Sequence, residues 1–192
     1  MLPTLRTARL ILRPATAADV DVLWSLWTDV DVRRFLWDDV EIGREQAASV
    51  LSEWDAQAEA GLGGWVIHSA DGEFIGCAAL AAVGLVAQFE SQLTGGIEAL
   101  IALAPRAWHR GYGTEALDAV IDYAFAALGP EALVAAVDVP NEASHRLMLR
   151  VGFEVIGESD GPRYRLRSYR LTRDRHAARR GDSGAAATPC GS

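Results

Sequence analysis

The sequence of 192 residues predicts one domain of mixed α and β structure, in which helices flank a mostly antiparallel sheet. Two helical stretches near the start precede a hairpin, whose apolar strands are joined by an Asp-Gly pair at residues 71–72. From residue 96 onward the pattern becomes strand, helix, strand, helix and two more strands. A helix that links two neighbouring strands makes them parallel, so we expect one parallel pair within the sheet.

Each element has a local signal. The first strand alternates apolar and charged residues and stops at Pro14, and the first helix follows the capping residues Thr16 and Asp19. Elsewhere the period of the apolar residues separates helices from strands, and glycines mark several of the ends. We expect strands at residues 9–13, 65–68, 74–80, 96–103, 133–139, 153–156 and 164–171. We expect helices at residues 20–27, 43–60, 114–128 and 142–150.

Composition narrows the function classes. The net charge of −8 argues against a broad nucleic-acid surface and is compatible with a basic partner such as an amine. All 18 basic residues are arginine, which excludes chemistry that needs a lysine Schiff base or a Walker lysine. The two cysteines, Cys77 and Cys190, and the histidines have no metal-ligand spacing, so no metal is expected. No segment resembles a membrane span or a secretion signal, and we expect a cytoplasmic protein without a membrane partner.

The domain is expected to end before the C-terminus. After the last strand the sequence turns basic from Arg173 and then becomes rich in Gly, Ala and Ser. Such a composition is typical of flexible chain ends, because it offers little apolar surface to bury. We therefore predict a domain over residues 1–171 and a flexible tail over residues 172–192.

Residues 108–114, Trp-His-Arg-Gly-Tyr-Gly-Thr, carry the strongest functional signal. They lie between a predicted strand and the start of a helix, where unpaired N–H groups and the helix dipole stabilise a phosphate. Gly111 and Gly113 let the backbone approach an anion closely, while Arg110 adds positive charge and Thr114 adds a hydroxyl donor. A tight glycine turn that only starts a helix is the simpler alternative.

Two other types of phosphate loop fit less well. The Walker loop is excluded because no Gly-Lys-Ser/Thr follows. Gly111, Gly113 and Ala116 do satisfy the Gly-x-Gly-x-x-Gly/Ala spacing of dinucleotide-binding folds. Asp138 also lies near the expected ribose-binding position. Against this alternative, residues 105–110 separate the glycines from the strand, and too little chain follows the next strand for a doubly wound sheet.

Residues 104–116, APRAWHRGYGTEA, resemble the acetyl-CoA motif of the GNAT superfamily of N-acetyltransferases. More narrowly, they resemble the branch that contains the ribosomal-protein alanine N-acetyltransferases. Three more segments resemble the opening strand of that branch, its central hairpin and the helix after its next strand, in that order. They lie at residues 7–14, 72–76 and 141–153. Each segment alone is weak evidence, but four in register over residues 4–171 are specific.

The resemblance implies a GNAT-like α/β (α+β) fold with six or seven strands, flanking helices and a splayed parallel strand pair that holds CoA. It also implies acetyl-CoA as co-substrate. The backbones of Ile101 and Leu103 would face the pantetheine arm. Asn141 would hydrogen-bond the same arm, although Asn141 equally suits a plain helix N-cap. The implied pyrophosphate-binding residues are Trp108, His109, Arg110, Gly111, Tyr112, Gly113 and Thr114.

The resemblance further implies catalytic residues. Glu98 occupies a frequent glutamate position of the family and would take the amine proton, unless it is an outward-facing strand residue. Many members carry a tyrosine that protonates the thiolate where this chain has Met148, which has no proton to give. Ser144, one turn earlier, matches a serine of the ribosomal branch and would supply that proton, unless it only bonds the local backbone. His145 is expected to be solvated.

In this superfamily the first helices and the loop that joins them mainly determine which acceptor substrate is bound. Here the loop contains Trp37, Asp38 and Asp39, which would bind a cationic amine unless they form a solvated acidic loop. Residues 81–93 would add another wall. The implied activity is acetyl transfer from acetyl-CoA to a primary amine, of a protein N-terminus or a small molecule, by direct attack in a ternary complex. The alternative from another class is a non-catalytic acyl-CoA-binding module, and the resemblance also allows a homodimer.

Overall fold

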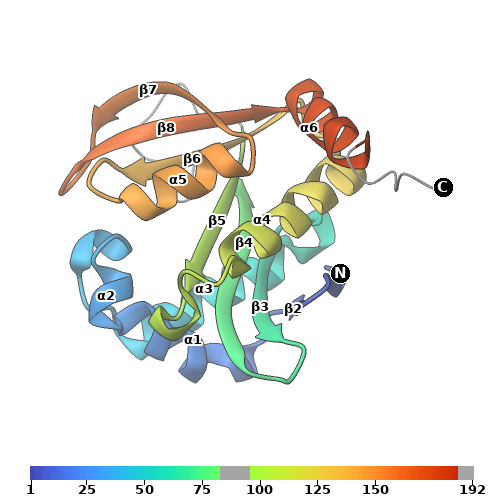
Figure 1. Ribbon diagram of the computed structural model, residues 1–192. Coiled ribbons are helices and arrows are strands. Elements are labelled where there is room, and N and C mark those ends of the chain that lie inside the picture. Colours follow the sequence, from blue (N-terminus) through green and yellow to red (C-terminus); the bar gives the residue numbers. More distant parts are fainter. Residues whose placement is uncertain (83–95, 186–192) are drawn as a thin grey trace.

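Within residues 1–82 and 96–185, which the computed structural model describes, eight strands form one sheet in the order β1-β2-β3-β4-β5-β6-β8-β7 (Figure 1). The strands are β1 (Leu5–Arg6), β2 (Leu10–Pro14), β3 (Gly63–Ser69), β4 (Phe74–Ala82), β5 (Ile97–Leu103), β6 (Ala132–Asp138), β7 (Glu154–Asp160) and β8 (Arg165–Thr172). The helices are α1 (Val20–Thr28), α2 (Val30–Arg33), α3 (Arg44–Gln57), α4 (Tyr112–Tyr123), α5 (Glu142–Arg150) and α6 (Arg173–Ala185). Short helical turns include η2 (Trp37–Asp39) and η4 (Pro105–Ala107).

The predicted α/β fold class is confirmed. The sheet has more than the six or seven expected strands because the two-residue strand β1 adds to its edge. Two residues are too few to show an alternating pattern, so this strand leaves no sequence signal. None of the helices in the described ranges is long and apolar enough to cross a bilayer. Of the predicted wall at residues 81–93, only the first two lie in the described part of the chain, at the end of β4.

Two hydrophobic cores lie on opposite faces of the sheet. Along β3, Trp65 and Ile67 belong to one core and Val66 to the other, as the alternation of a strand requires. The first core is covered by α4 and α5, which contribute Leu117 and Met148, and Figure 1 shows both helices on the near side. The second core is covered by α1 and α3. The helix that follows the predicted phosphate loop and the helices near the predicted acceptor loop therefore lie on opposite faces.

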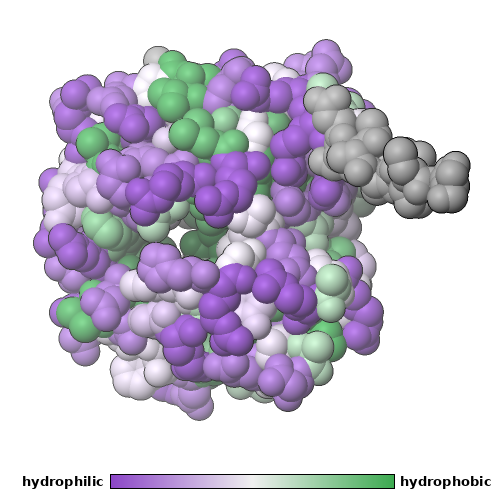
Figure 2. Space-filling view, viewed as in Figure 1, coloured by the Kyte–Doolittle hydropathy of each residue, from purple (hydrophilic) through white to green (hydrophobic). Residues whose placement is uncertain are grey.

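β5 and β6 form the predicted parallel pair, but they part early. They pair at their first residues only, with Glu98 opposite Val134 as the last pair. β5 then continues with β4 as its partner, and β6 continues with β8. The two strands diverge in Figure 1, and Figure 2 shows an opening between the two parts of the molecule that carry them. We call the space between residues 99–103 of β5 and 135–138 of β6 the wedge.

The predicted flexible tail is wrong for α6, which packs against α4. Arg179 pairs with Asp118, and His176 stacks on Phe125 with ring centroids 4.8 Å apart. The basic residues that suggested a solvated tail recur at helical spacing, so they face the acidic side of α4 together. Residues 186–192 lie outside the described part of the chain.

Gly76 in β4 tests the packing beside the wedge. Its φ is +153°, and a Cβ there would lie 2.2 Å from the carbonyl oxygen of Ala102. We expect Gly76→Ala to lower the free energy of unfolding by about 2–4 kcal/mol, because backbone atoms cannot move aside cheaply. Gly43→Ala is the matched control, since nothing lies within 4 Å of its added Cβ. Urea denaturation measures both variants, and equal midpoints would contradict this account.

Candidate functional site

The loop between β5 and α4 presents unpaired backbone N–H groups. His109 has a φ of 59° and Gly111 of 79°, so the chain passes twice through left-handed conformations just before α4 begins at Tyr112. No acceptor among the described residues meets the N–H groups of residues 109–114. A run of free N–H groups at a helix N-terminus stabilises an anion. These features fit a diphosphate, the group that the sequence predicts here.

The backbone of β5 faces the wedge at alternate residues. The N–H of Ala104 donates to the carbonyl of Ile75 at 2.9 Å, on the β4 side. Because such bonds recur at every second residue of an antiparallel pair, Ile101 and Leu103 direct their backbone groups away from β4 and into the wedge. The carbonyl of Leu103 accepts a 2.8 Å hydrogen bond from the indole N–H of Trp108, which ties the loop to the end of the strand. Both predicted pantetheine contacts therefore lie at the wedge.

Charged side chains surround the loop. The guanidinium of Arg110 lies 5.0 Å from the centroid of the Tyr112 ring, and its Nη1 is 3.8 Å from Glu73 Oε2. Glu73 also accepts a 3.0 Å hydrogen bond from Arg106. The contact between Arg110 and Glu73 is long and exposed, so it holds the guanidinium weakly. Arg110 is therefore available to an anion at the loop.

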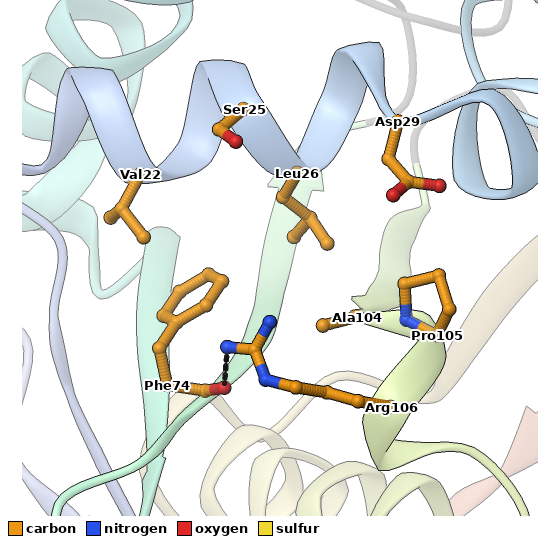
Figure 3. Close-up of a pocket in the computed structure, with 8 residues that line it drawn as sticks. All are labelled: Val22, Ser25, Leu26, Asp29, Phe74, Ala104, Pro105 and Arg106. Atoms are coloured by element: carbon orange, nitrogen blue, oxygen red, sulfur yellow. Dashed lines mark hydrogen bonds between the residues drawn. The ribbon is translucent and has the colours of Figure 1, made fainter.

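A cavity of about 300 Å³ lies between α1 and the end of β5 (Figure 3). Its two charged lining groups are both engaged within the protein. Arg106 donates to the carbonyl of Phe74 at 2.8 Å, and the Asp29 carboxylate caps α2 by accepting from the backbone N–H groups of Asp31 and Val32. The remaining lining residues are Val22, Ser25, Leu26, Ala104 and Pro105. This cavity therefore offers no free charged group for chemistry.

Glu98 sits at the closed end of the wedge. Its side chain is buried, with the residue 4% exposed, so the alternative of an outward-facing strand glutamate is wrong. Burial raises the pKa of Glu98 to about 7, although a hydrogen bond from the backbone of Ala136 opposes the shift. No polar partner of its Oε2 atom is found among the described residues. Glu98 is therefore a buried carboxyl group that exchanges its proton near neutral pH.

Three residues that the sequence analysis singled out, Asn141, Ser144 and Met148, lie at the N-cap of α5 or within it. The side chain of Asn141 accepts a 3.1 Å hydrogen bond from the backbone N–H of Ser144, so Asn141 is an N-cap. Its amide NH₂ remains a donor for another group. The hydroxyl of Ser144 makes no hydrogen bond with any other described residue. Met148 is buried in the first core, so this position offers neither a proton nor exposure to the wedge.

His145 is buried, contrary to the expectation that it is solvated. Its Nε2 lies 2.9 Å from the carbonyl oxygen of Val139, and its Nδ1 lies 2.7 Å from the hydroxyl of Tyr169. Since a carbonyl only accepts, Nε2 donates to Val139, and Nδ1 forms the second hydrogen bond with the Tyr169 hydroxyl. The three groups tie α5 to the end of β6. His145 and the apolar Met148 are three residues apart on α5, and this spacing places both on the same face of the helix. That was the sequence signal from which the burial of His145 could have been predicted.

The predicted acceptor loop is strained and paired. Trp37, Asp38 and Asp39 have φ values of 58°, 53° and 62°, a conformation that each residue adopts at a cost of about 1–3 kcal/mol. Asp39 pairs with Arg163 of the β7–β8 turn at 2.5 Å, so the alternative of a solvated loop is wrong for Asp39. Burial, and then the charge of Asp38, raise the pKa of Asp138, which Arg163 opposes. The loop therefore lies near the end of β6, where the wedge is open.

Comparisons with known proteins identify the family of this chain. A family model described as an acetyltransferase (GNAT) domain matches residues 9–154. The chain belongs to the GNAT family. A relative in Bacillus subtilis (strain 168), the uncharacterized N-acetyltransferase YoaA, is 32% identical over 160 residues, which are 82% of this chain and 86% of the relative. These matches do not single out the ribosomal-protein alanine branch, which stays a prediction.

Solved GNAT structures share the fold. A putative GNAT-family acetyltransferase from Bordetella pertussis has a TM-score of 0.76 at 22% identity, over 88% of this chain and 99% of its own. A spermidine N-acetyltransferase from Vibrio cholerae, solved with CoA and spermine, has a TM-score of 0.71 at 17% identity. The match covers 89% of this chain and 99% of that structure's chain. The dinucleotide-binding alternative is wrong, because within the described sheet only β5 and β6 are parallel, whereas a doubly wound fold needs consecutive parallel strands.

The raised pKa of Glu98 predicts a pH-dependent stability. A pKa of about 7 in the folded protein lies above the ordinary value of 4.5, so ionisation of Glu98 favours unfolding. Relative to Glu98→Gln, the wild type should lose up to about 3 kcal/mol of stability between pH 4.5 and 7, and little beyond. Urea unfolding at several pH values measures the difference. Glu53→Gln, at an exposed position of α3, is the control and should follow the wild type; a pH-independent difference for Glu98→Gln would contradict the assignment.

Proposed function

We propose that this GNAT protein transfers the acetyl group of acetyl-CoA to a primary amine, by direct attack in a ternary complex. The observation that carries the proposal is the early parting of β5 and β6 beside a loop of free N–H groups. A linear ligand with an anionic end matches both features at once, because the strand offers backbone groups and the loop offers an anion site. The Vibrio cholerae neighbour, solved with CoA and spermine, supports the same pairing of ligands.

The acetyl-CoA side of the site uses backbone more than side chains. Residues 108–114 would hold the pyrophosphate, with Arg110 released from Glu73 to join it. Ile101 and Leu103 would bond the pantetheine arm as a strand does, and the free amide of Asn141 would meet the same arm from α5. A backbone N–H of β5 in the wedge would donate to the acetyl carbonyl oxygen as negative charge develops on it.

The chemistry requires one proton to leave the amine and one to reach sulfur. The amine nitrogen attacks the thioester carbon, and Glu98 takes the amine proton directly or through a water molecule. A base with a pKa of about 7 suits this step, because about half of it is ionised at neutral pH and the ionised form binds a proton readily. As the carbon–sulfur bond breaks, the thiolate takes a proton from the free hydroxyl of Ser144 or from water. Met148 takes no part.

The acceptor side is acidic. Asp39 is already neutralised by Arg163, which leaves Asp38 and Asp138 to attract a cation at the open end of the wedge. The half-buried Trp37 would form a wall beside them. We therefore propose a cationic amine as acceptor. We also propose that residues 1–171 form the transferase domain, with α6 as an added helix on α4.

The decisive experiment is a screen of acetyl acceptors. Purified protein is mixed with acetyl-CoA and either peptides with free N-termini, polyamines or other small amines, and released CoA is measured with a thiol reagent. The proposal predicts CoA release that depends on one class of amine. Tight binding of acetyl-CoA in calorimetry without release for any amine would favour the non-catalytic module, and absence of binding would overturn both.

Substitution of Gly111 tests the assignment of residues 108–114 as the loop that binds the pyrophosphate. A side chain at φ +79° is strained, and its Cβ would stand 3.3 Å from Arg9 Nη2, so a large side chain would force the loop backbone to shift. We expect Gly111→Leu to weaken acetyl-CoA binding at least about tenfold in calorimetry. Gly129→Leu is the matched control, because Gly129 also has a positive φ of +66° beside an arginine, after the helical turn η5 (Ala124–Leu128) that follows α4. Equal affinities of the two variants would refute the loop assignment.

Substitution of Glu98 tests its proposed role as the base that takes the amine proton. We expect Glu98→Gln to lower kcat by about 10²–10⁴-fold with little change in acetyl-CoA affinity, since an amide cannot accept the proton. In the wild type, kcat/KM should rise with pH through about 7, because only ionised Glu98 is a base, and the variant should lack this rise. Steady-state rates between pH 5.5 and 9 measure both. A variant that keeps the wild-type rate and profile clears Glu98 of the role.

A further inference from the structure

Arg9, just before β2, lies against the phosphate loop although it precedes Arg110 by 101 residues. Its Nη1 donates to the carbonyl oxygen of Arg110 at 2.9 Å. Its guanidinium carbon is 4.7 Å from the centroid of the Tyr112 ring, which Arg110 also approaches. Tyr112 therefore lies within cation–π distance of two arginines, and Arg9 touches the loop through both backbone and ring.

Glu115 in the first turn of α4 fixes Arg9 in this place. Its carboxylate accepts hydrogen bonds from Nε of Arg9 at 2.6 Å, from the backbone N–H of Arg9 at 2.8 Å and from the hydroxyl of Thr7 at 2.5 Å. Burial raises the pKa of Glu115, but the bonds from Thr7 and Arg9 outweigh it and leave the pKa below its ordinary value. Glu115 is therefore an anion close to the anion site, and Arg9 compensates its charge.

The bond from Arg9 also sets the direction of one peptide. In a planar trans peptide the C=O and the following N–H point in opposite directions. Because Arg9 holds the carbonyl of Arg110, the N–H of Gly111 points away from Arg9. This N–H is one of the free donors of the loop. Gly111 itself has no Cβ to crowd Arg9 Nη2, which stands 3.3 Å from where a Cβ would be.

We propose that Arg9 is a positioning residue of the acetyl-CoA site, which orients the N–H of Gly111 and cancels the charge of Glu115 so that the loop can bind a diphosphate. This inference deepens the proposed function and rests on it. Arg9 acts on the diphosphate end of the donor alone, because its contacts reach the loop and not the wedge. Loss of Arg9 should therefore harm donors that carry a diphosphate and spare donors that lack one.

The test compares acetyl-CoA with S-acetylpantetheine, which has the thioester and the pantetheine arm but no diphosphate. For Arg9→Gln we expect KM for acetyl-CoA to rise about tenfold, with kcat within about twofold of wild type. The kcat/KM for S-acetylpantetheine should not change. Arg9→Lys keeps the charge but lacks the planar fork that reaches both Glu115 and Arg110, so it should recover only part of the loss.

Arg44→Gln is the matched control. Arg44 makes an exposed Nε contact of the same 2.6 Å length with Asp21, far along the chain from the loop, and its loss should leave both donors unaffected. Melting temperatures of all variants show whether they fold. An unchanged KM for acetyl-CoA in Arg9→Gln overturns the inference, and so does an equal loss with both donors, which would mean a general structural role.

Inorganic pyrophosphate separates this inference from the proposed function. If the wild type binds no acetyl-CoA, the proposed function fails, and calorimetry with pyrophosphate then decides the role of Arg9 at the loop. Weaker pyrophosphate binding by Arg9→Gln than by wild type and Arg44→Gln would support Arg9 as the residue that shapes an anion site. Equal binding, or none by any of the three proteins, would overturn it.

Discussion

The parting of β5 and β6 after Glu98 is the constraint on which the rest of the site depends. Buried backbone groups need hydrogen-bond partners, so a sheet stays open in its middle only if its strands are secured elsewhere and a ligand or water meets the free groups. Here β4 pairs with β5 along its whole length, and β8 does the same for β6. The wedge is therefore built into the sheet, and the proposed function gives it a strand-like ligand as occupant.

The same parting accounts for the chemistry of Glu98. Because Glu98 is in the last pair before the strands separate, its side chain is enclosed at the closed end, where water solvates a carboxylate poorly. Its pKa of about 7 follows from that burial, and so does the predicted loss of stability between pH 4.5 and 7. A destabilising carboxyl group at the closed end of a gap is a candidate for a functional role, which is why we propose Glu98 as the base. Stability and reactivity here have one cause.

Local patterns predicted much of this arrangement, whereas contacts between distant segments could not be read from the sequence. The glycines of residues 108–114 and the strand–helix–strand order sit within short stretches, so periodicity and spacing were enough to find them. The burial of His145 depends on Tyr169, and the strained acceptor loop depends on Arg163. α6 had a helical repeat of charges, but its partners lie on α4 and composition alone suggested a free tail.

The two ligands of the proposed function, a diphosphate and a cationic amine, carry opposite charges, and the two ends of the wedge differ in charge as well. The protein as a whole carries a net charge of −8, so the proposed diphosphate would be repelled at long range and attracted only within a Debye length of about 8–10 Å of Arg110, since Glu115 and Glu73 pair with Arg9 and Arg106. The proposed cationic amine would be attracted at both ranges, first by the net charge and then by Asp38 and Asp138. Guanidinium groups suit the first task, since their planar forks pair with glutamates and lie over Tyr112 at once, which an ammonium cannot do. The proposed function therefore gives each ligand the end of the wedge whose charges suit it.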